Sequence, residues 1–221
     1  MSDPICVKAK GILFDMDGVL ISSIGSVERC WRRWAEMYDV PNAAEYAVPH
    51  GMRAIDIVKA LRPDIDPQAG LRVIEDMEVE DVSDLVVLPG ARALLEGLPP
   101  ERWAIVTSCT HRLMLARLKA AGFPLPERII SGDMVERGKP DPEPYRRGAE
   151  LLGFLPEECV VVEDAPSGVG AGKAAGCRVL GVLGTHSTGE LRAADWVVAS
   201  LEGLEVMVDP DGLELRFSPV A

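Results

Sequence analysis

Two pairs of acidic residues directly follow apolar runs in this 221-residue sequence, as Asp15-Met16-Asp17-Gly18 and Glu163-Asp164. Residues i and i+2 of a strand face the same side, so Asp15 and Asp17 can point into one site. Carboxylates gathered without a counter-ion repel one another, and a hard divalent cation with oxygen ligands relieves that repulsion. The pattern predicts a Mg²⁺ site formed by Asp15, Asp17, Glu163 and Asp164. Taken alone, however, D-x-D-G is also consistent with an ordinary acidic turn.

Groups suited to holding a phosphate lie at two other places. The run Thr107-Ser108-Cys109-Thr110 ends an apolar stretch and leads into a helical pattern, where hydroxyls and backbone N–H groups can bind phosphate. Thr110 could instead be a plain helix cap. Lys139 lies in a rigid Gly-Lys-Pro frame and can pair with a phosphate or a carboxylate. The primary hydroxyl is left open between Thr107 and Ser108, because the end of the strand can shift by one residue.

Apolar runs alternate with amphipathic helical stretches around these residues. The runs lack polar alternation, which is typical of parallel strands covered on both faces. They span residues 11–14, 103–106, 128–130, 159–162, 178–182 and 196–198, and the helical patterns span residues 111–121, 142–152 and 167–175. A glycine follows each helical pattern and can end it. The sequence therefore predicts an α/β fold with a doubly wound, Rossmann-like parallel sheet.

One region lacks this alternation. Between residues 22 and 87 the apolar residues recur with a helical period, and proline and glycine divide the segment. We expect an inserted all-helical cap domain at 22–87 and a core domain at 1–21 and 88–221. His50 and Arg53 follow Pro49 at a predicted helix start and are the cap's candidate substrate contacts, although both could be ordinary solvated residues. Trp31 and Trp34 are expected in the cap's own core.

Composition limits the partners. Lys and Arg number 23 against 35 Asp and Glu, so the formal net charge of -12 disfavours binding to nucleic acid or to an anionic membrane surface. The five cysteines are widely spaced and form no C-x-x-C pair, which favours a reducing compartment. No signal-peptide pattern or long apolar run is visible. We expect a cytoplasmic protein, a monomer or weak dimer, whose partner is a small metabolite.

Together, these residues resemble the four motifs of the haloacid dehalogenase superfamily of phosphotransferases. Asp15-x-Asp17-Gly18 is similar to the first motif, Thr107-Ser108 to the second, Lys139-Pro140 to the third and Glu163-Asp164 to the fourth. They occur in the family's order, and the helical insert lies where its C1-type cap does. Residues 48–53 and the segments around the second, third and fourth motifs, at 102–108, 138–145 and 163–168, are most similar to the branch of glycerol-3-phosphatase, 2-deoxyglucose-6-phosphatase and bacterial sugar phosphatases. The chain departs from many relatives at Ile21-Ser22-Ser23, where they carry Asp-Ser near the cap hinge.

The resemblance implies a mechanism. Asp15 would be the covalent nucleophile and Asp17 the general acid and base. Mg²⁺ would bind Asp15, the backbone carbonyl of Asp17 and Asp164, with Glu163 nearby or acting through water. Thr107 or Ser108 and Lys139 would hold the transferring phosphoryl group. Cys109 and Thr110, with the cap residues named above, complete the predicted substrate site.

This resemblance implies a Mg²⁺-dependent phosphatase acting on small sugar or polyol phosphates. One alternative is a β-phosphoglucomutase, which has the same motifs and cap type but returns the phosphoryl group to a sugar. Another is an inactive binding module with the same fold, which is disfavoured because every motif acid and Lys139 are present. The segment at residues 211–217 is expected to form an additional short strand of unassigned role.

Overall fold

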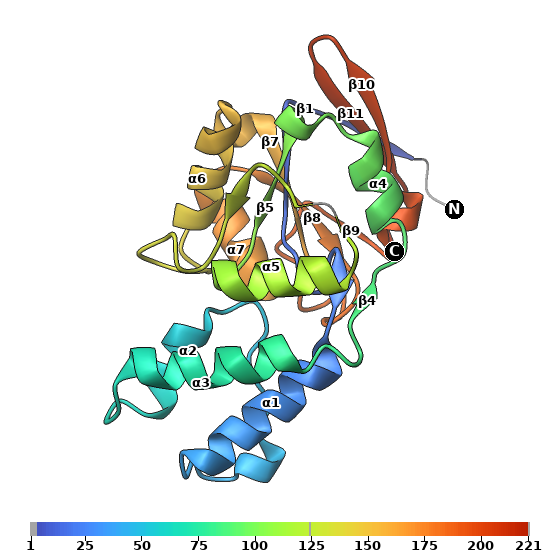
Figure 1. Ribbon diagram of the computed structural model, residues 1–221. Coiled ribbons are helices and arrows are strands. Elements are labelled where there is room, and N and C mark those ends of the chain that lie inside the picture. The colour runs from blue at the N-terminus through green and yellow to red at the C-terminus, as the bar shows by residue number, and fades with distance from the viewer. Residues whose placement is uncertain (1–3, 124, 221) are drawn as a thin grey trace.

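The computed structural model describes residues 4–123 and 125–220 and has a six-stranded parallel sheet at its centre (Figure 1). The order of its strands is β6-β5-β2-β7-β8-β9. The strands are β2 (Gly11–Phe14), β5 (Trp103–Val106), β6 (Ile129–Ile130), β7 (Cys159–Glu163), β8 (Arg178–Val182) and β9 (Trp196–Val198). Every strand predicted for the sheet is present, and the doubly wound α/β fold is confirmed.

The strand order reverses at β2. From β2 the chain continues to β5 and β6 on one side, then crosses to β7, β8 and β9 on the other. Phe14 at the end of β2 is level with Ile105 of β5 and with Val162 of β7. Ligands of open α/β sheets bind at such a reversal, beyond the carboxyl ends of the strands. The two acidic motifs and the hydroxyl motif therefore open onto the same crevice.

Helices cover both faces of this sheet. Leu13 and Val161 lie in an apolar cluster with residues of α6 and α7, whereas Ile12 and Phe14 lie in a second cluster with residues of α4 and α5. Their bounds are α4 (Ala91–Gly97), α5 (His111–Ala120), α6 (Glu143–Leu152) and α7 (Pro166–Ala175). Short 3₁₀ turns span Ala43–Glu45, Pro100–Arg102, Pro156–Glu158 and Leu201–Gly203. Successive residues of a strand face opposite sides of the sheet, and helices cover both sides. The strands are therefore apolar throughout.

The inserted segment forms a separate layer below the sheet domain in Figure 1. Its helices are α1 (Ile24–Met37), α2 (Ala54–Leu61) and α3 (Pro67–Glu80). They enclose their own apolar cluster, in which Trp31 and Trp34 are buried, as expected. We propose the boundaries 22–87 for the cap and 1–21 with 88–221 for the core, because the segment has its own core and the chain enters and leaves it side by side.

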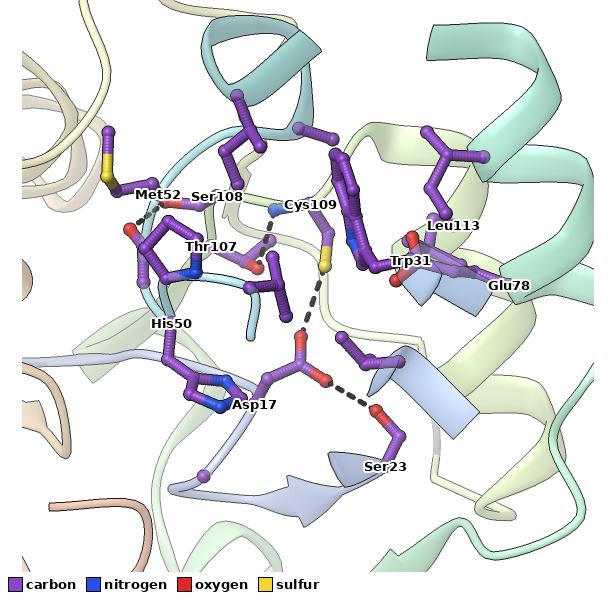
Figure 2. Close-up of a pocket in the computed structure, with 18 of the residues that line it drawn as sticks. Asp17, Ser23, Trp31, His50, Met52, Glu78, Thr107, Ser108, Cys109 and Leu113 are labelled. Carbon is purple, nitrogen blue, oxygen red and sulfur yellow. Dashed lines mark hydrogen bonds between the residues drawn. The ribbon is translucent and has the colours of Figure 1, made fainter. Parts of the chain in front are cut away.

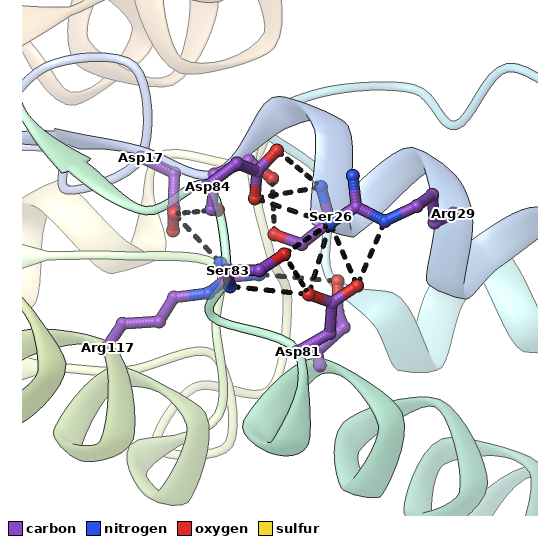
Figure 3. Close-up of polar contacts among 9 residues, drawn as sticks. Asp17, Ser26, Arg29, Asp81, Ser83, Asp84 and Arg117 are labelled. Atoms are coloured by element: carbon purple, nitrogen blue, oxygen red, sulfur yellow. Dashed lines mark hydrogen bonds and ion pairs between the residues drawn. The ribbon is translucent and has the colours of Figure 1, made fainter.

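Both linkers of the cap meet at a small antiparallel ribbon that the sequence did not predict. In it β3 (Ile21–Ser22) pairs with β4 (Val86–Val87). Next to the ribbon, the carboxylate of Asp84 accepts hydrogen bonds from the backbone N–H of Ser26, at 2.9 and 3.2 Å, in the first turn of α1 (Figure 3). An aspartate of the second linker therefore binds the start of the first cap helix.

A second sheet packs at the edge of the core domain. Its antiparallel order is β1-β11-β10, with β1 (Ile5–Ala9), β10 (Glu205–Asp209) and β11 (Gly212–Phe217). The additional strand expected at residues 211–217 is β11, and its buried residues join the cluster on the α4 and α5 face. Among the described residues, no helix is long and apolar enough to cross a membrane.

Candidate active site

Asp15 lies on the floor of the crevice, immediately after β2. Its backbone N–H donates to the carbonyl of Val162 at 3.0 Å, which fixes it beside the end of β7. Lys139 reaches it from the loop before α6, and Nζ donates to Oδ1 of Asp15 at 2.7 Å and to the carbonyl of Val106 at 3.0 Å. Asp15 lines the pocket, and within the described chain no hydrogen bond reaches its Oδ2. One carboxylate oxygen is thus anchored and the other is open to a ligand.

Glu163 anchors Lys139 from the other side. Its Oε1 accepts from Nζ of Lys139 at 2.7 Å and from the Tyr145 hydroxyl at 2.9 Å. Its Oε2 accepts from the backbone N–H groups of Asp164 and Ala165, at 2.9 and 3.0 Å. Both oxygens of this fully buried carboxylate are therefore hydrogen-bonded, and Glu163 holds the lysine in place in this structure.

Burial of these charges shifts their titration. Burial raises the pKa of Asp15 to about 7, although the ammonium of Lys139 opposes this effect. Burial also raises the pKa of Asp164, and the nearby Glu163 carboxylate adds to it. For Lys139 burial acts in the opposite direction, but the carboxylates of Asp15 and Glu163 outweigh it and raise its pKa. The site holds more buried negative charge than one lysine can balance.

The donor set fits a magnesium ion. Asp15, Glu163 and Asp164 each place a carboxylate oxygen within 4.8 Å of the others. Hard oxygen donors with uncompensated negative charge are what Mg²⁺ prefers. Gly18 lets these groups approach, because its φ is +85° and a Cβ there would lie 1.9 Å from Oδ2 of Asp164. The D-x-D-G motif therefore needs its glycine both for the backbone turn and for the space beside Asp164.

Asp17 is closer to solvent than Asp15, and its side chain is 30% exposed. Its Oδ1 accepts from Nη1 of Arg117 at 2.8 Å and from the Ser23 hydroxyl at 3.3 Å. Its Oδ2 accepts from the Cys109 thiol at 3.1 Å, as Figure 2 shows. Burial raises the pKa of the Cys109 thiol, with the Asp17 carboxylate adding to the shift, so the sulfur remains a donor. Asp17 is therefore held by the core, the hinge and helix α5 together.

The predicted hydroxyl groups both line the pocket but have different partners. Thr107 is buried, and its Oγ1 accepts from the backbone N–H of Cys109 at 3.1 Å (Figure 2). Ser108 donates its hydroxyl to the carbonyl of Gly51 in the cap, at 2.7 Å. Thr110 caps α5 by accepting from the N–H of Leu113 at 3.3 Å and also contacts the cap carboxylate of Glu75. Thr107 is thus tied to the core alone, whereas Ser108 and Thr110 contact the cap.

The two cap candidates are placed differently. His50 lines the pocket, and burial lowers its pKa, with His186 adding to the shift. Arg53 is outside the pocket lining and pairs with Asp56, Nε to Oδ2 at 2.7 Å. Its guanidinium also donates to the core carbonyls of Val135 and Glu136, at 2.9 and 3.1 Å. In this structure Arg53 joins the cap to the core, and substrate contact by this residue stays a prediction.

Three charged residues of the described pocket, Glu75, Glu78 and Arg117, were not predicted from the sequence. Arg117 of α5 and Glu78 of α3 are both buried, and they pair with each other across the boundary between core and cap, Nη2 to Oε1 at 3.4 Å. The available signal was the position of Arg117 among Leu113, Met114 and Leu118 on the apolar side of its helix. A cation at such a position needs a buried partner.

Comparisons with known proteins identify the family of the chain. Residues 9–176 match the family model of the haloacid dehalogenase-like hydrolases. The chain belongs to this family. It is 42% identical to hexitol phosphatase A of Escherichia coli over 93% of this chain and 98% of that protein. It is 32% identical to glycerol-1-phosphate phosphohydrolase 2 of Saccharomyces cerevisiae, over 92% and 87% of the two chains.

Among solved structures, a putative β-phosphoglucomutase from Thermotoga maritima is similar with a TM-score of 0.61 and 30% identity, over 87% of this chain and 95% of that one. The predicted family membership and the prediction of a phosphatase enzyme of the haloacid dehalogenase superfamily are confirmed. Within this haloacid dehalogenase-like hydrolase, the individual roles of the site residues stay predictions.

Proposed function

We propose that the protein hydrolyses small sugar or polyol phosphate monoesters with Mg²⁺, through an aspartyl-phosphate on Asp15. The observation that carries this proposal is the asymmetry of Asp15. Lys139 fixes its Oδ1 at 2.7 Å, while its Oδ2 accepts no hydrogen bond within the described residues, and Asp15 lines a pocket with Asp17 and Thr107. A carboxylate held in this way is oriented before the substrate arrives, as covalent catalysis requires.

Each core residue has a role in the proposed reaction. Asp15 forms a bond to phosphorus while the ester P–O bond breaks, and Asp17 gives a proton to the departing oxygen. In the second step Asp17 takes a proton from the attacking water, the bond from phosphorus to Asp15 breaks, and inorganic phosphate leaves. Lys139 balances the charge of Asp15. Thr107 is the favoured donor to the phosphoryl oxygens, because Ser108 gives its hydroxyl to the cap.

Asp15, the backbone carbonyl of Asp17 and Asp164 are the proposed ligands of Mg²⁺. When bound, the ion neutralises the repulsion between a carboxylate nucleophile and a phosphate dianion. Glu163 is close enough to belong to the site, but its oxygens are already bonded to Lys139, Tyr145 and backbone N–H groups. We therefore propose that it acts through Lys139 or through water.

The cap side of the pocket favours an uncharged leaving group. It carries the apolar Trp31 and Ile74 and the carboxylates Glu75 and Glu78. Carboxylates accept hydrogen bonds from hydroxyl groups but repel carboxylates and second phosphates. The names of the hexitol and glycerol phosphate phosphatases among its relatives support a polyol or sugar monoester.

The β-phosphoglucomutase alternative needs a bisphosphate intermediate, and therefore a cation for the second phosphate. Arg117 is the arginine that lines the described pocket, and it is already paired with Asp17 and Glu78. It is therefore not free to bind a second phosphate. This favours hydrolysis over transfer to a sugar. An inactive binding module is disfavoured because three of the four motif acids, Asp15, Glu163 and Asp164, cluster beside Lys139. We further propose a cytoplasmic location and a monomer or weak dimer, from composition alone.

The test is a screen of phosphate release from small phosphate monoesters, including hexitol, hexose and glycerol phosphates, with Mg²⁺. Asp15→Asn is the matched control, because it keeps the size of the side chain but removes the attacking charge. We expect release from wild type and background release from the variant, and a wild-type mass increase of one phosphoryl group when the reaction is quenched in acid. Isomerisation of a hexose 1-phosphate that requires a bisphosphate primer, without phosphate release, would instead support the mutase.

A further inference from the structure

A buried arginine connects the cap to the expected acid–base group. Arg117 projects from α5 with its side chain 4% exposed, and its guanidinium reaches two carboxylates. Nη1 lies 2.8 Å from Oδ1 of Asp17, and Nη2 lies 3.4 Å from Oε1 of Glu78 (Figure 3 shows Asp17 and Arg117). Asp17 belongs to the core loop after β2, whereas Glu78 belongs to cap helix α3. One planar group thus touches both parts of the molecule.

The charges at this point depend on one another. Glu78 is buried, and burial raises its pKa to about 7, although Arg117 opposes the shift. Removing one member of a buried ion pair leaves an uncompensated charge, which is strongly unfavourable. Arg117 therefore has a strong preference for a position in which both carboxylates are within reach. Glu78 can pair with Arg117 only while α3 lies against α5.

A second set of contacts holds the same two helices together at the surface. Arg112 of α5 pairs with Glu75 at 2.8 Å and with Asp76 at 2.6 Å, both on α3. Arg112 and Asp76 are exposed, Glu75 is only 12% exposed, and this set of contacts does not reach Asp17. It provides a natural comparison, because it joins the same helices without touching the group expected to move protons.

We propose that Arg117 is a positioning residue that sets the carboxylate of Asp17, and that Glu78 makes this positioning depend on closure of the cap. The guanidinium has a fixed, planar set of donors, so its orientation toward Glu78 also determines where Nη1 meets Asp17. When the cap lifts, Arg117 loses Glu78 and its geometry at Asp17 is released. The inference rests on the proposed function, since it assigns Asp17 the acid–base role.

The inference predicts a dependence on the leaving group. A poor leaving group needs a proton from Asp17 when the ester bond breaks, whereas p-nitrophenolate leaves without one. A misplaced Asp17 therefore slows hydrolysis of an alkyl or phenyl phosphate more than hydrolysis of p-nitrophenyl phosphate. An altered fold, or a weaker hold on the phosphoryl group, would lower both alike.

The experiment compares kcat/KM for phenyl phosphate, p-nitrophenyl phosphate and the best sugar or polyol phosphate in four proteins. These are wild type, Arg117→Lys, Glu78→Gln and the control Arg112→Gln. Arg117→Lys keeps the positive charge but lacks the two separate nitrogens that contact Asp17 and Glu78. We expect its loss of kcat/KM to be at least about tenfold larger for the poor leaving groups than for p-nitrophenyl phosphate. Glu78→Gln should show the same trend less strongly, and Arg112→Gln should leave the ratio unchanged. Equal losses on all substrates in Arg117→Lys would overturn the proposal.

A second comparison separates positioning from direct contact with the substrate, since both residues line the pocket. If Arg117 acts through Asp17, Arg117→Lys should not change the ratio of the two aryl phosphates any further in an Asp17→Asn background. An undiminished effect there would mean direct substrate contact and refute the inference. Circular dichroism and Tm identify unfolded variants, in which case Glu78→Gln carries the same test. Absence of phosphate release by wild type would refute the proposed function instead.

Discussion

Replacing Asp15 by asparagine should stabilise the metal-free protein at neutral pH while abolishing its activity. The structural reason is the burial of Asp15 beside Glu163 and Asp164, which raises its pKa from an ordinary value of 3.8 to about 7. Asparagine has the same shape without the charge. Lys139 still keeps its ion pair with Glu163 at 2.7 Å, so the substitution leaves no unpaired ammonium.

The magnitude follows from proton linkage. Between pH 3.8 and about 7 the folded state binds more protons at Asp15 than the unfolded state does, so the free energy of unfolding decreases as pH rises through this window. One pKa unit corresponds to about 1.4 kcal/mol, so the raised pKa of Asp15 costs about 2 kcal/mol at pH 5, where the folded state keeps the proton, and about 4 kcal/mol at pH 7.5, where most of the carboxyl is ionised. Asp15→Asn should therefore gain about 2 kcal/mol more over wild type at pH 7.5 than at pH 5.

The assay is urea denaturation with EDTA, followed by circular dichroism at both pH values. Mg²⁺ added at pH 7.5 should raise the stability of wild type and have a smaller effect on the variant, because the ion replaces the missing positive charge. A variant less stable than wild type at pH 7.5, or an advantage that does not change with pH, would refute the reasoning that Asp15 is held at an electrostatic cost.

The remaining predictions concern the metal, the turn and the cap. EDTA should abolish phosphate release and Mg²⁺ should restore it, while Ca²⁺ should support it poorly because calcium prefers longer bonds and more ligands; full activity in a verified metal-free sample would contradict the carboxylate site. Gly18→Ala should lower Tm and reduce phosphate release to near background, because its Cβ would lie 1.9 Å from Asp164 at a φ of +85°, and wild-type values for both would show that the turn tolerates a side chain. Arg53→Ala removes bonds to Val135 and Glu136 that hold the cap on the core, worth about 1.5–3 kcal/mol if charge-assisted. Its kcat/KM should fall by a similar factor for a sugar phosphate and for p-nitrophenyl phosphate, whereas a loss confined to the sugar phosphate would establish the substrate contact that the sequence predicted.

Much of the core could be predicted because its signals are local. The parallel strands are short, continuous apolar runs, and each acidic motif directly follows one of them, so a sequence pattern gives both the strand and its chemical end. The antiparallel ribbon between the two cap linkers escaped prediction. Strands β3 and β4 have two residues each, too few for a periodic pattern, and they exist because the two linkers of the cap lie side by side.

Sequence alone predicted that Asp15, Asp17, Lys139 and Glu163 would meet at one place, since strand ends in a parallel sheet converge on one edge. Tertiary structure decided what each of them touches. Glu163 faces Lys139 and Tyr145 with Oε1, which depends on how α6 packs on the sheet.

Arg117 meets Asp17 across 100 positions of sequence and Glu78 across 39. Both contacts depend on the rotation of α5 and on the seating of α3 against it. A helical period fixes which residues share a face of one helix, but packing between distant segments chooses the partner of that face. For this reason the acids of the candidate active site could be predicted from the sequence, whereas the buried guanidinium that joins Asp17 to the cap became visible only in the folded structure.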